Sequence, residues 1–186
     1  MNDIRARRRQ AILNAAIDEF CRCGFERARM DAIAARAGIG KSTIYEYFPS
    51  KLALLEAVGE MMYNRIAEEV GAIMNADTPF RAKAIQYIRM LERLMDQIGE
   101  HGMALFRQEA SSLRICDELA HRYLEEVWGT LRTAVMQAQE AGELRSDADP
   151  QIIVSMLIAL PHPPIVRRKR LCAEDYIDML MQGIAP

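Results

Sequence analysis

Residues 30–51 read MDAIAARAGIGKSTIYEYFPSK, and this stretch decides the fold. Apolar residues recur at helical spacing up to Ala37, and Gly38 suits the left-handed conformation that ends a helix at little cost. A second short helix follows, with Ile44 and Phe48 together on its inner side. The pattern predicts a helix-turn-helix, in which the second helix lies in the major groove of DNA.

The same stretch contains part of a nucleotide-binding motif. Gly40-Lys41-Ser42 matches the end of a phosphate-binding loop, G-x-x-x-x-G-K-[ST]. The first glycine of that motif would fall at position 35, where the chain has Ala35. The loop should also follow a buried strand, whereas residues 34–37 follow a helical pattern. A nucleotide site is therefore not predicted here.

Residues from about 9 to 58 resemble the DNA-binding domain of the TetR family of repressors. Beyond them, only the helical layout and the length support the resemblance. The family usually has Thr or Ser where this chain has Ala28-Arg29, and Ser where it has Gly40, so two side-chain caps are missing. Arg29 is expected to take over the phosphate contact at that corner. The matching residues are Gly24-Phe25, Ile33-Ala34, Ala37-Gly38, Lys41, Thr43-Ile44-Tyr45, Tyr47-Phe48 and Ser50-Lys51.

The resemblance implies an all-α protein of about nine helices in two domains. A three-helix DNA-binding head is expected at residues 1–51, and a larger effector-binding and dimerisation body at 52–186. The body would bind a small, largely apolar effector and form a homodimer through its last two helices. Such a dimer would bind a palindromic double-stranded DNA operator, with recognition helices about 34–36 Å apart. Effector binding would release the DNA.

The expected DNA contacts come from the helix-turn-helix and the basic start of the chain. Short hydroxyl side chains suit base-edge contacts, while Lys, Arg and Tyr suit phosphates. The arginines near the N-terminus can alternatively form a solvated basic turn. Lys51 begins the fourth helix, where backbone N–H groups also favour a phosphate. The candidates are Arg5, Arg8, Arg29, Lys41, Ser42, Thr43, Tyr45, Tyr47 and Lys51.

The candidate effector pocket consists mainly of Met and aromatic residues at helical spacing in the body. Met is adaptable and frequent at promiscuous binding surfaces, but the same spacing also describes ordinary core. A few polar side chains close to these residues could orient a ligand. The candidates are Met61, Tyr87, Met90, Met103, Phe106, Arg107, His121, Trp128 and Met156.

The seven remaining helix predictions follow from periodicity and capping signals. Thr78 with Pro79, and Asp149 with Pro150, indicate helix starts, and Gly142 indicates a helix end. Outside the helix-turn-helix, helices are expected at about 4–23, 50–75, 80–98, 103–113, 116–141, 149–160 and 173–182.

Charge and composition agree with a DNA-binding regulator. Residues 1–51 carry 10 Lys and Arg against 6 Asp and Glu, while the remainder carries 14 against 20, so a basic head precedes an acidic body. Four scattered cysteines and no long apolar run predict a reduced cytoplasmic protein that does not enter a membrane. No residue spacing suggests a metal, a cofactor or a catalytic set, so an enzyme is not expected.

Two alternatives remain open on sequence alone. The body could serve as a ligand-binding or interaction module without operator-specific DNA binding. The protein could also activate transcription, or repress it without any small ligand.

Overall fold

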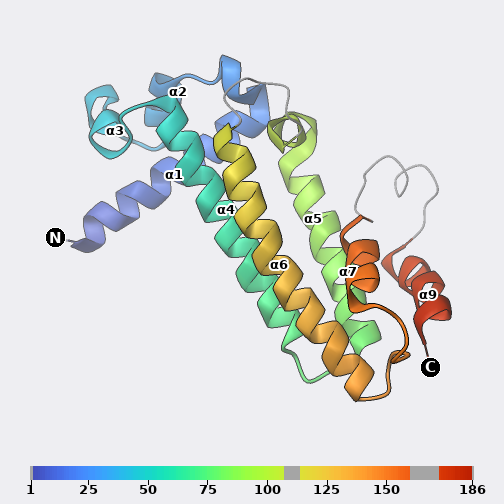
Figure 1. The fold of residues 1–186 in the computed structure, drawn as a ribbon. Helices are drawn as coiled ribbons and strands as arrows, with labels where there is room; N and C mark the ends of the chain where they lie inside the picture. Colours follow the sequence, from blue (N-terminus) through green and yellow to red (C-terminus); the bar gives the residue numbers. More distant parts are fainter. Residues whose placement is uncertain (1, 107–113, 160–171, 186) are drawn as a thin grey trace. The chain divides into compact units, whose positions relative to one another are not determined.

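The computed structural model describes residues 2–106, 114–159 and 172–185, which contain eight helices and no strand (Figure 1). Side chains are described throughout these ranges except at residues 2, 95, 98–106, 114–124 and 159. The predicted all-α fold is confirmed. In chain order the helices are α1 (Asn2–Arg27), α2 (Met30–Arg36), α3 (Lys41–Tyr47), α4 (Lys51–Met74), α5 (Phe80–Phe106), α6 (Arg114–Glu140), α7 (Pro150–Ala159) and α9 (Ala173–Ile184).

The chain divides into two compact units, each with its own apolar core. The first unit comprises Met1–Asn64 and Ile98–His121, and the second comprises Arg65–Gln97 and Arg122–Pro186. Burying apolar surface is the main favourable term in folding, so each cluster stabilises its own unit. The first cluster includes Ile12, Leu13, Phe20, Ile33, Ile44 and Leu54, and the second includes Val70, Phe80, Leu131, Ile153 and Ile177.

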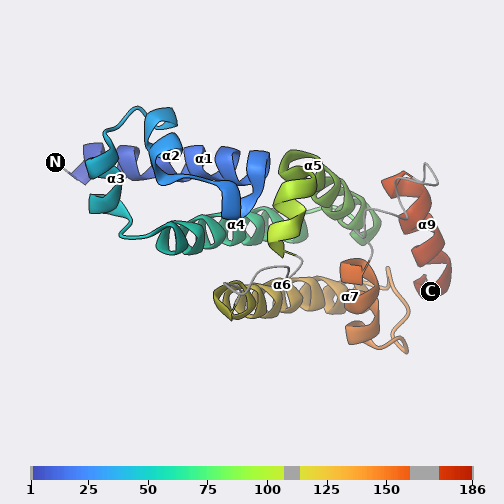
Figure 2. The ribbon, with the colours of Figure 1, turned by 90° about the horizontal axis from the view of Figure 1, so that it is seen from above.

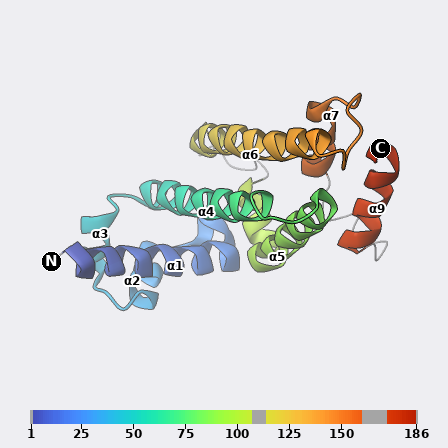
Figure 3. The same cartoon turned by 90° about the horizontal axis from the view of Figure 1, so that it is seen from below.

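In the first unit, α2 and α3 lie alongside α1, with α3 beside the N-terminal half of that helix (Figures 2 and 3). The predicted inner residues of α1, Ile12, Leu13, Ala16 and Phe20, are fully buried, and Ile17 is half-buried. The last turn of α1 departs from helical geometry at Gly24, whose φ is 78°. The predicted helix end at Gly24 is therefore present as a kink, followed by one further turn.

In the second unit, α9 is joined to α5 by ion pairs around an apolar interface. Ile177 and Leu180 of α9 are buried in the second cluster. Asp178 accepts two hydrogen bonds from Arg81, at 2.7 and 2.9 Å, and Glu174 pairs with Arg89. Such exposed pairs contribute little individually, so the apolar face carries most of the attachment.

Capping chemistry explains several helix boundaries. The Ser50 hydroxyl accepts the Ala53 N–H at 3.0 Å, and the Asp149 carboxylate accepts the Gln151 N–H at 2.8 Å, as the sequence predicts. Gly142, with φ at 74°, ends α6. The break predicted between helices at 80–98 and 103–113 is wrong, because α5 continues to Phe106, while residues 107–113 lie outside the described residues.

None of the helices in the described part of the chain is long and apolar enough to cross a membrane.

Candidate nucleic-acid interface

The turn between α2 and α3 fixes the direction of the second helix. Gly38 adopts a positive φ of 69°, which an L-residue with a side chain rarely tolerates. The Ile39 N–H then reaches back to the Ala34 carbonyl at 3.0 Å, closing the end of α2. Gly40 is extended and precedes α3 without a side-chain cap. The chain therefore turns sharply and starts α3 on a fixed path.

The two faces of α3 separate packing from exposed chemistry. Ile44 is fully buried and Phe48 is 4% exposed, both in the core of the first unit. Lys41, at the start of the helix, and Ser42 and Tyr45 are exposed. The other two predicted contacts on α3, Thr43 and Tyr47, are half-buried. Glu46, which was not predicted to contact DNA, is also exposed. The helix thus presents a polar face of the kind that base edges and phosphates require.

The basic start of α1 lies against the end of α3. The Arg5 guanidinium is 5.8 Å from the centre of the Tyr47 ring, and that of Arg9 is 5.4 Å from the Phe48 ring. Both distances fall within the range of cation–π attraction. Arg8 is exposed on the same helix. The structure therefore brings predicted residues from two separate segments, Arg5 and Tyr47, into contact.

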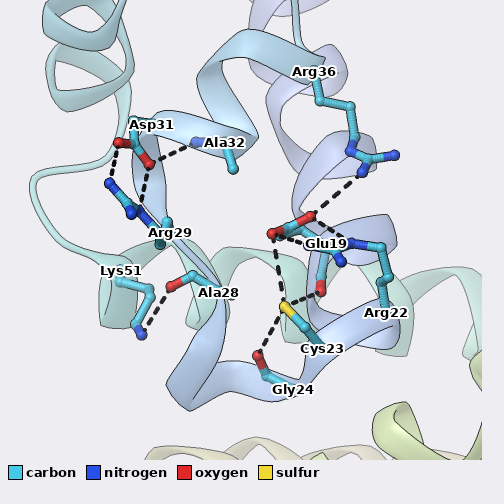
Figure 4. A network of polar contacts seen from close by, with 10 residues as sticks. All are labelled: Glu19, Arg22, Cys23, Gly24, Ala28, Arg29, Asp31, Ala32, Arg36 and Lys51. Atoms are coloured by element: carbon cyan, nitrogen blue, oxygen red, sulfur yellow. Dashed lines mark hydrogen bonds and ion pairs between the residues drawn. The ribbon is translucent and has the colours of Figure 1, made fainter.

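Arg29 makes a two-pronged pair at the start of α2 (Figure 4). Its guanidinium donates to both carboxylate oxygens of Asp31, at 3.1 and 2.7 Å. Asp31 also accepts the Ala32 N–H at 2.9 Å, which partly replaces the missing side-chain cap. The hydrogen bonds from Arg29, with the Ala32 N–H and the charge of Lys41, hold the pKa of Asp31 below its ordinary value. Three donors of the Arg29 fork remain for other partners.

Lys51 has a structural role in place of the side-chain phosphate contact that the sequence predicts. Its ammonium donates to the carbonyls of Phe25, Glu26 and Ala28 at 2.7, 3.1 and 3.1 Å, and it lies 4.5 Å from the centre of the Phe25 ring. An ammonium has three N–H donors, and the carbonyls of Phe25 and Glu26 at the end of α1 and of Ala28 just after it use all of them. Lys51 therefore ties the first turn of α4 to the corner between α1 and α2.

Glu19 is a buried carboxylate that the sequence did not single out. It is 2% exposed and accepts two hydrogen bonds from Arg22, at 3.1 and 2.8 Å, and one from Arg36 at 3.4 Å (Figure 4). The Cys23 thiol also donates to it, at 3.7 Å. The hydrogen bonds from Arg22 are the main cause that lowers the pKa of Glu19, and they outweigh burial, which acts to raise it. The contact with Arg36 joins α1 to the end of α2.

The predicted effector residues divide between the two clusters. Tyr87 and Met90 are each 3% exposed in the second cluster, where Trp128 packs at the edge, and burial raises the pKa of Tyr87 to about 12. Met61 packs against the first cluster, whereas Tyr87 and Met90 belong to the second, so Met61 does not share a pocket lining with them as the sequence predicts. Met156 is 45% exposed, because it lies on the outer side of α7. Arg107 and the side chains of Met103, Phe106 and His121 lie outside the described residues.

Acidic, histidine and cysteine side chains do not gather into a metal-binding group within the described ranges.

Comparison with known proteins identifies the family. Residues 12–58 match the model of the bacterial regulatory proteins of the tetR family. The chain is 32% identical over 159 residues to the HTH-type transcriptional regulator RutR of Escherichia coli O157:H7, an alignment that covers 82% of this chain and 71% of that protein. The matched segment contains α2, α3 and the exposed face described above.

Solved structures share the fold. The SmeT–triclosan complex superposes with a TM-score of 0.73 at 22% identity, over 96% of this chain and 92% of that one. A second structure, of SmeT as the repressor of the Stenotrophomonas maltophilia multidrug efflux pump SmeDEF, gives a TM-score of 0.70 at the same identity, over 96% and 90% of the two chains. The chain is therefore a DNA-binding transcriptional regulator that belongs to the TetR family.

Proposed function

We propose that the protein is a repressor that binds a palindromic operator as a homodimer and releases it when a small, largely apolar effector binds. The observation that carries the proposal is the exposed polar face of α3, held by the buried Ile44 and Phe48. A helix so mounted can enter a major groove about 12 Å wide. Residues 1–51 would form the DNA-binding domain, and 52–186 the effector-binding and dimerisation domain.

Within this proposal the length of each side chain on α3 decides whether it contacts base edges or phosphates. Ser42 and Thr43 are short and suit base edges or thymine methyl groups, while Lys41 can reach a guanine edge or a phosphate. Tyr45, which is 44% exposed, and Tyr47 would donate their hydroxyls to phosphates. The remaining proposed contacts, to phosphates only, come from Arg5, Arg8 and Arg29.

The proposed dimer uses the last two helices, α7 and α9. Ile152 is 60% and Met156 45% exposed, and they share one face of α7 because they are four residues apart. Met179 of α9 is 64% exposed. Exposed apolar side chains on both helices support burial against a second copy of the chain. A two-fold dimer would present two copies of α3 to successive turns of one DNA face.

The proposed effector site lies in the second cluster, around Tyr87, Met90 and Trp128. Support comes from the SmeT–triclosan complex, in which a protein of the same fold holds a small molecule. Release of DNA requires only that the effector bind more tightly to the arrangement that does not fit the operator. A coupling of about 1–3 kcal/mol corresponds to a 5- to 150-fold change in operator affinity.

The test is selection of genomic DNA by the purified protein at about 150 mM salt, where non-specific phosphate binding is suppressed. A palindromic motif is expected. The double variant K41A/Y47A should lose the motif, whereas R132A, which removes an exposed charge from α6, should retain it. Failure of the wild-type protein to prefer any motif, after removal of co-purified ligand, would contradict the proposal. Reporter transcription then separates a repressor from an activator.

A further inference from the structure

The outermost residues of α3 are Ser42 and Glu46. At about 100° per residue, each lies within about 20° of the direction opposite to Ile44, which is fully buried. Both are exposed, whereas Thr43 and Tyr47, on one flank of the helix, are half-buried. Glu46 therefore lies on the part of the helix surface that is farthest from the core of the first unit.

The charge of Glu46 has no partner within the described part of the chain. Its carboxylate takes part in neither the ion pairs nor the hydrogen bonds found there. Lys41, five residues earlier, lies about 140° away around the helix. Glu46 is also in the last turn of α3, which has no basic residue and where the helix dipole disfavours an anion. Neither ion pairing nor helix stability accounts for a carboxylate at this position.

A carboxylate on this face needs a hydrogen-bond donor once α3 enters the major groove. An ionised carboxylate only accepts hydrogen bonds, and dehydration without a donor is costly. Guanine presents the N7 and O6 acceptors in that groove, and thymine presents the O4 acceptor and a methyl group. The base-edge donors available to Glu46 are therefore the amino groups of cytosine and adenine.

Cytosine suits the carboxylate better than adenine does. The N6 amino group of adenine lies next to the N7 acceptor, which repels the second carboxylate oxygen, whereas the N4 amino group of cytosine lies next to a C–H. We infer that Glu46 is a specificity-determining residue, which accepts a hydrogen bond from N4 of one cytosine in each half of the operator. The inference rests on the proposed function and names a base that this function leaves open.

Ser42, which shares the outermost face, differs from Glu46 in what it can exclude. A hydroxyl both donates and accepts, so it can pair with the edge of any base. The carboxylate of Glu46 repels the acceptors of guanine and thymine as well as attracting an amino group. Within this pair of residues, the stronger base preference is therefore assigned to Glu46.

The test compares the motifs that wild type, E46A, E46Q and E60Q select from randomised duplexes at about 150 mM salt. Glu60 is an exposed residue of α4, so E60Q makes the same change of net charge as E46Q on another helix. Wild type and E60Q should select cytosine at the same position of each half-site. E46A should accept every base there and keep the rest of the motif. E46Q should move the preference to adenine, because an amide matches N6 and N7 together.

Titration of duplexes that differ only at this base pair gives the size of the effect. Exchange of the cytosine in one half-site should weaken wild-type binding at least about fivefold, the lower end for a mismatched base pair. E46A should bind all these duplexes alike. Thermal unfolding should show both Glu46 variants to be as stable as wild type, because the side chain is exposed.

The opposite outcomes are equally distinct. An unchanged motif for E46A, or an affinity gain by E46A that is equal for every base, would overturn the inference and leave the proposed function intact. A Glu46-dependent preference for a base other than cytosine would overturn it as well. If wild type selects no motif, the proposed function fails and the inference fails with it.

Discussion

Two charged side chains of the first unit, Lys51 and Glu19, make hydrogen bonds within the protein and do not serve as exposed charges. Lys51 satisfies carbonyls at the end of α1, and Glu19 receives arginines from α1 and α2. Glu19 is buried, and a buried carboxylate without hydrogen bonds forfeits its hydration, so the arginines compensate a real cost. The charges left for DNA are those on α3, on the start of α1 and at Arg29.

Lysines 51 and 41 should therefore give opposite results when each is replaced by Met. Lys51→Met keeps the apolar stem but removes three hydrogen bonds to carbonyls, of which that of Phe25 still accepts the Ala28 N–H, so the free energy of unfolding should fall by about 1–3 kcal/mol. Lys41→Met should leave stability unchanged and weaken operator binding. Urea unfolding and DNA titration of both variants give the comparison, and a stable K51M protein would remove the structural role of Lys51.

Glu19→Gln should destabilise the protein by about 1–2 kcal/mol at neutral pH, since a carboxylate that accepts charged hydrogen bonds is lost. The pKa of Glu19 is lowered from 4.5, so its contribution is fully present above that value and disappears as pH falls through the lower, folded-state pKa. The difference in stability between the two proteins should therefore begin to shrink below about pH 4.5 and vanish below the folded-state pKa. Denaturant unfolding across this range tests it, with the exposed Glu26→Gln as control; a constant difference would argue against the ion-pair explanation.

Which residues of α3 are buried and which are exposed could be predicted from the sequence, whereas the roles of Lys51 and Glu19 could not. The alternation of buried Ile44 with exposed Lys41 and Tyr45 is set by helical periodicity within a few residues. Lys51 instead contacts carbonyls 23–26 residues earlier, and Arg36 reaches Glu19 across 17 residues. Such contacts depend on how the helices pack, which local patterns do not encode.

At the scale of helices, glycines with positive φ mark the ends of several helices. Gly38→Ala should lower the free energy of unfolding by about 1–2 kcal/mol, because φ is positive there. Nothing lies within 4 Å of the added methyl group, so the loss comes from the backbone conformation and not from a clash. The matched substitution Gly71→Ala, in the interior of α4 with equally open space, should stabilise by up to about 1 kcal/mol. Thermal unfolding of both variants tests the pair, and a shift in the same direction for both would show that backbone conformation is not the cause.

Helix boundaries were predicted best where a cap is encoded next to the boundary. Ser50, Asp149 and Gly142 each act within a few residues, and each is found in its expected role. The predicted break in α5 had only the reduced periodicity after Ile98 as its signal. A continuous backbone hydrogen-bond ladder does not need an apolar stripe along its whole length, so this signal was misleading.

At the scale of the whole molecule, the dimer proposed from α7 and α9 makes a clear prediction. The double variant I152E/M156E places two charges on the exposed face of α7 and should give a monomer in analytical ultracentrifugation. Because a monomer engages only one half-site, operator affinity should fall by 100-fold or more, on the order of the gain from bivalent binding. Met136→Glu, on an equally exposed apolar residue of α6, should remain dimeric. A dimeric double variant would place the interface elsewhere.

The only tryptophan of the chain, Trp128, packs at the edge of the second cluster. Its fluorescence is therefore an optical signal that belongs to one half of the protein. A candidate effector titrated against this emission can be scored without DNA, so a library of compounds can be ranked before any operator is known.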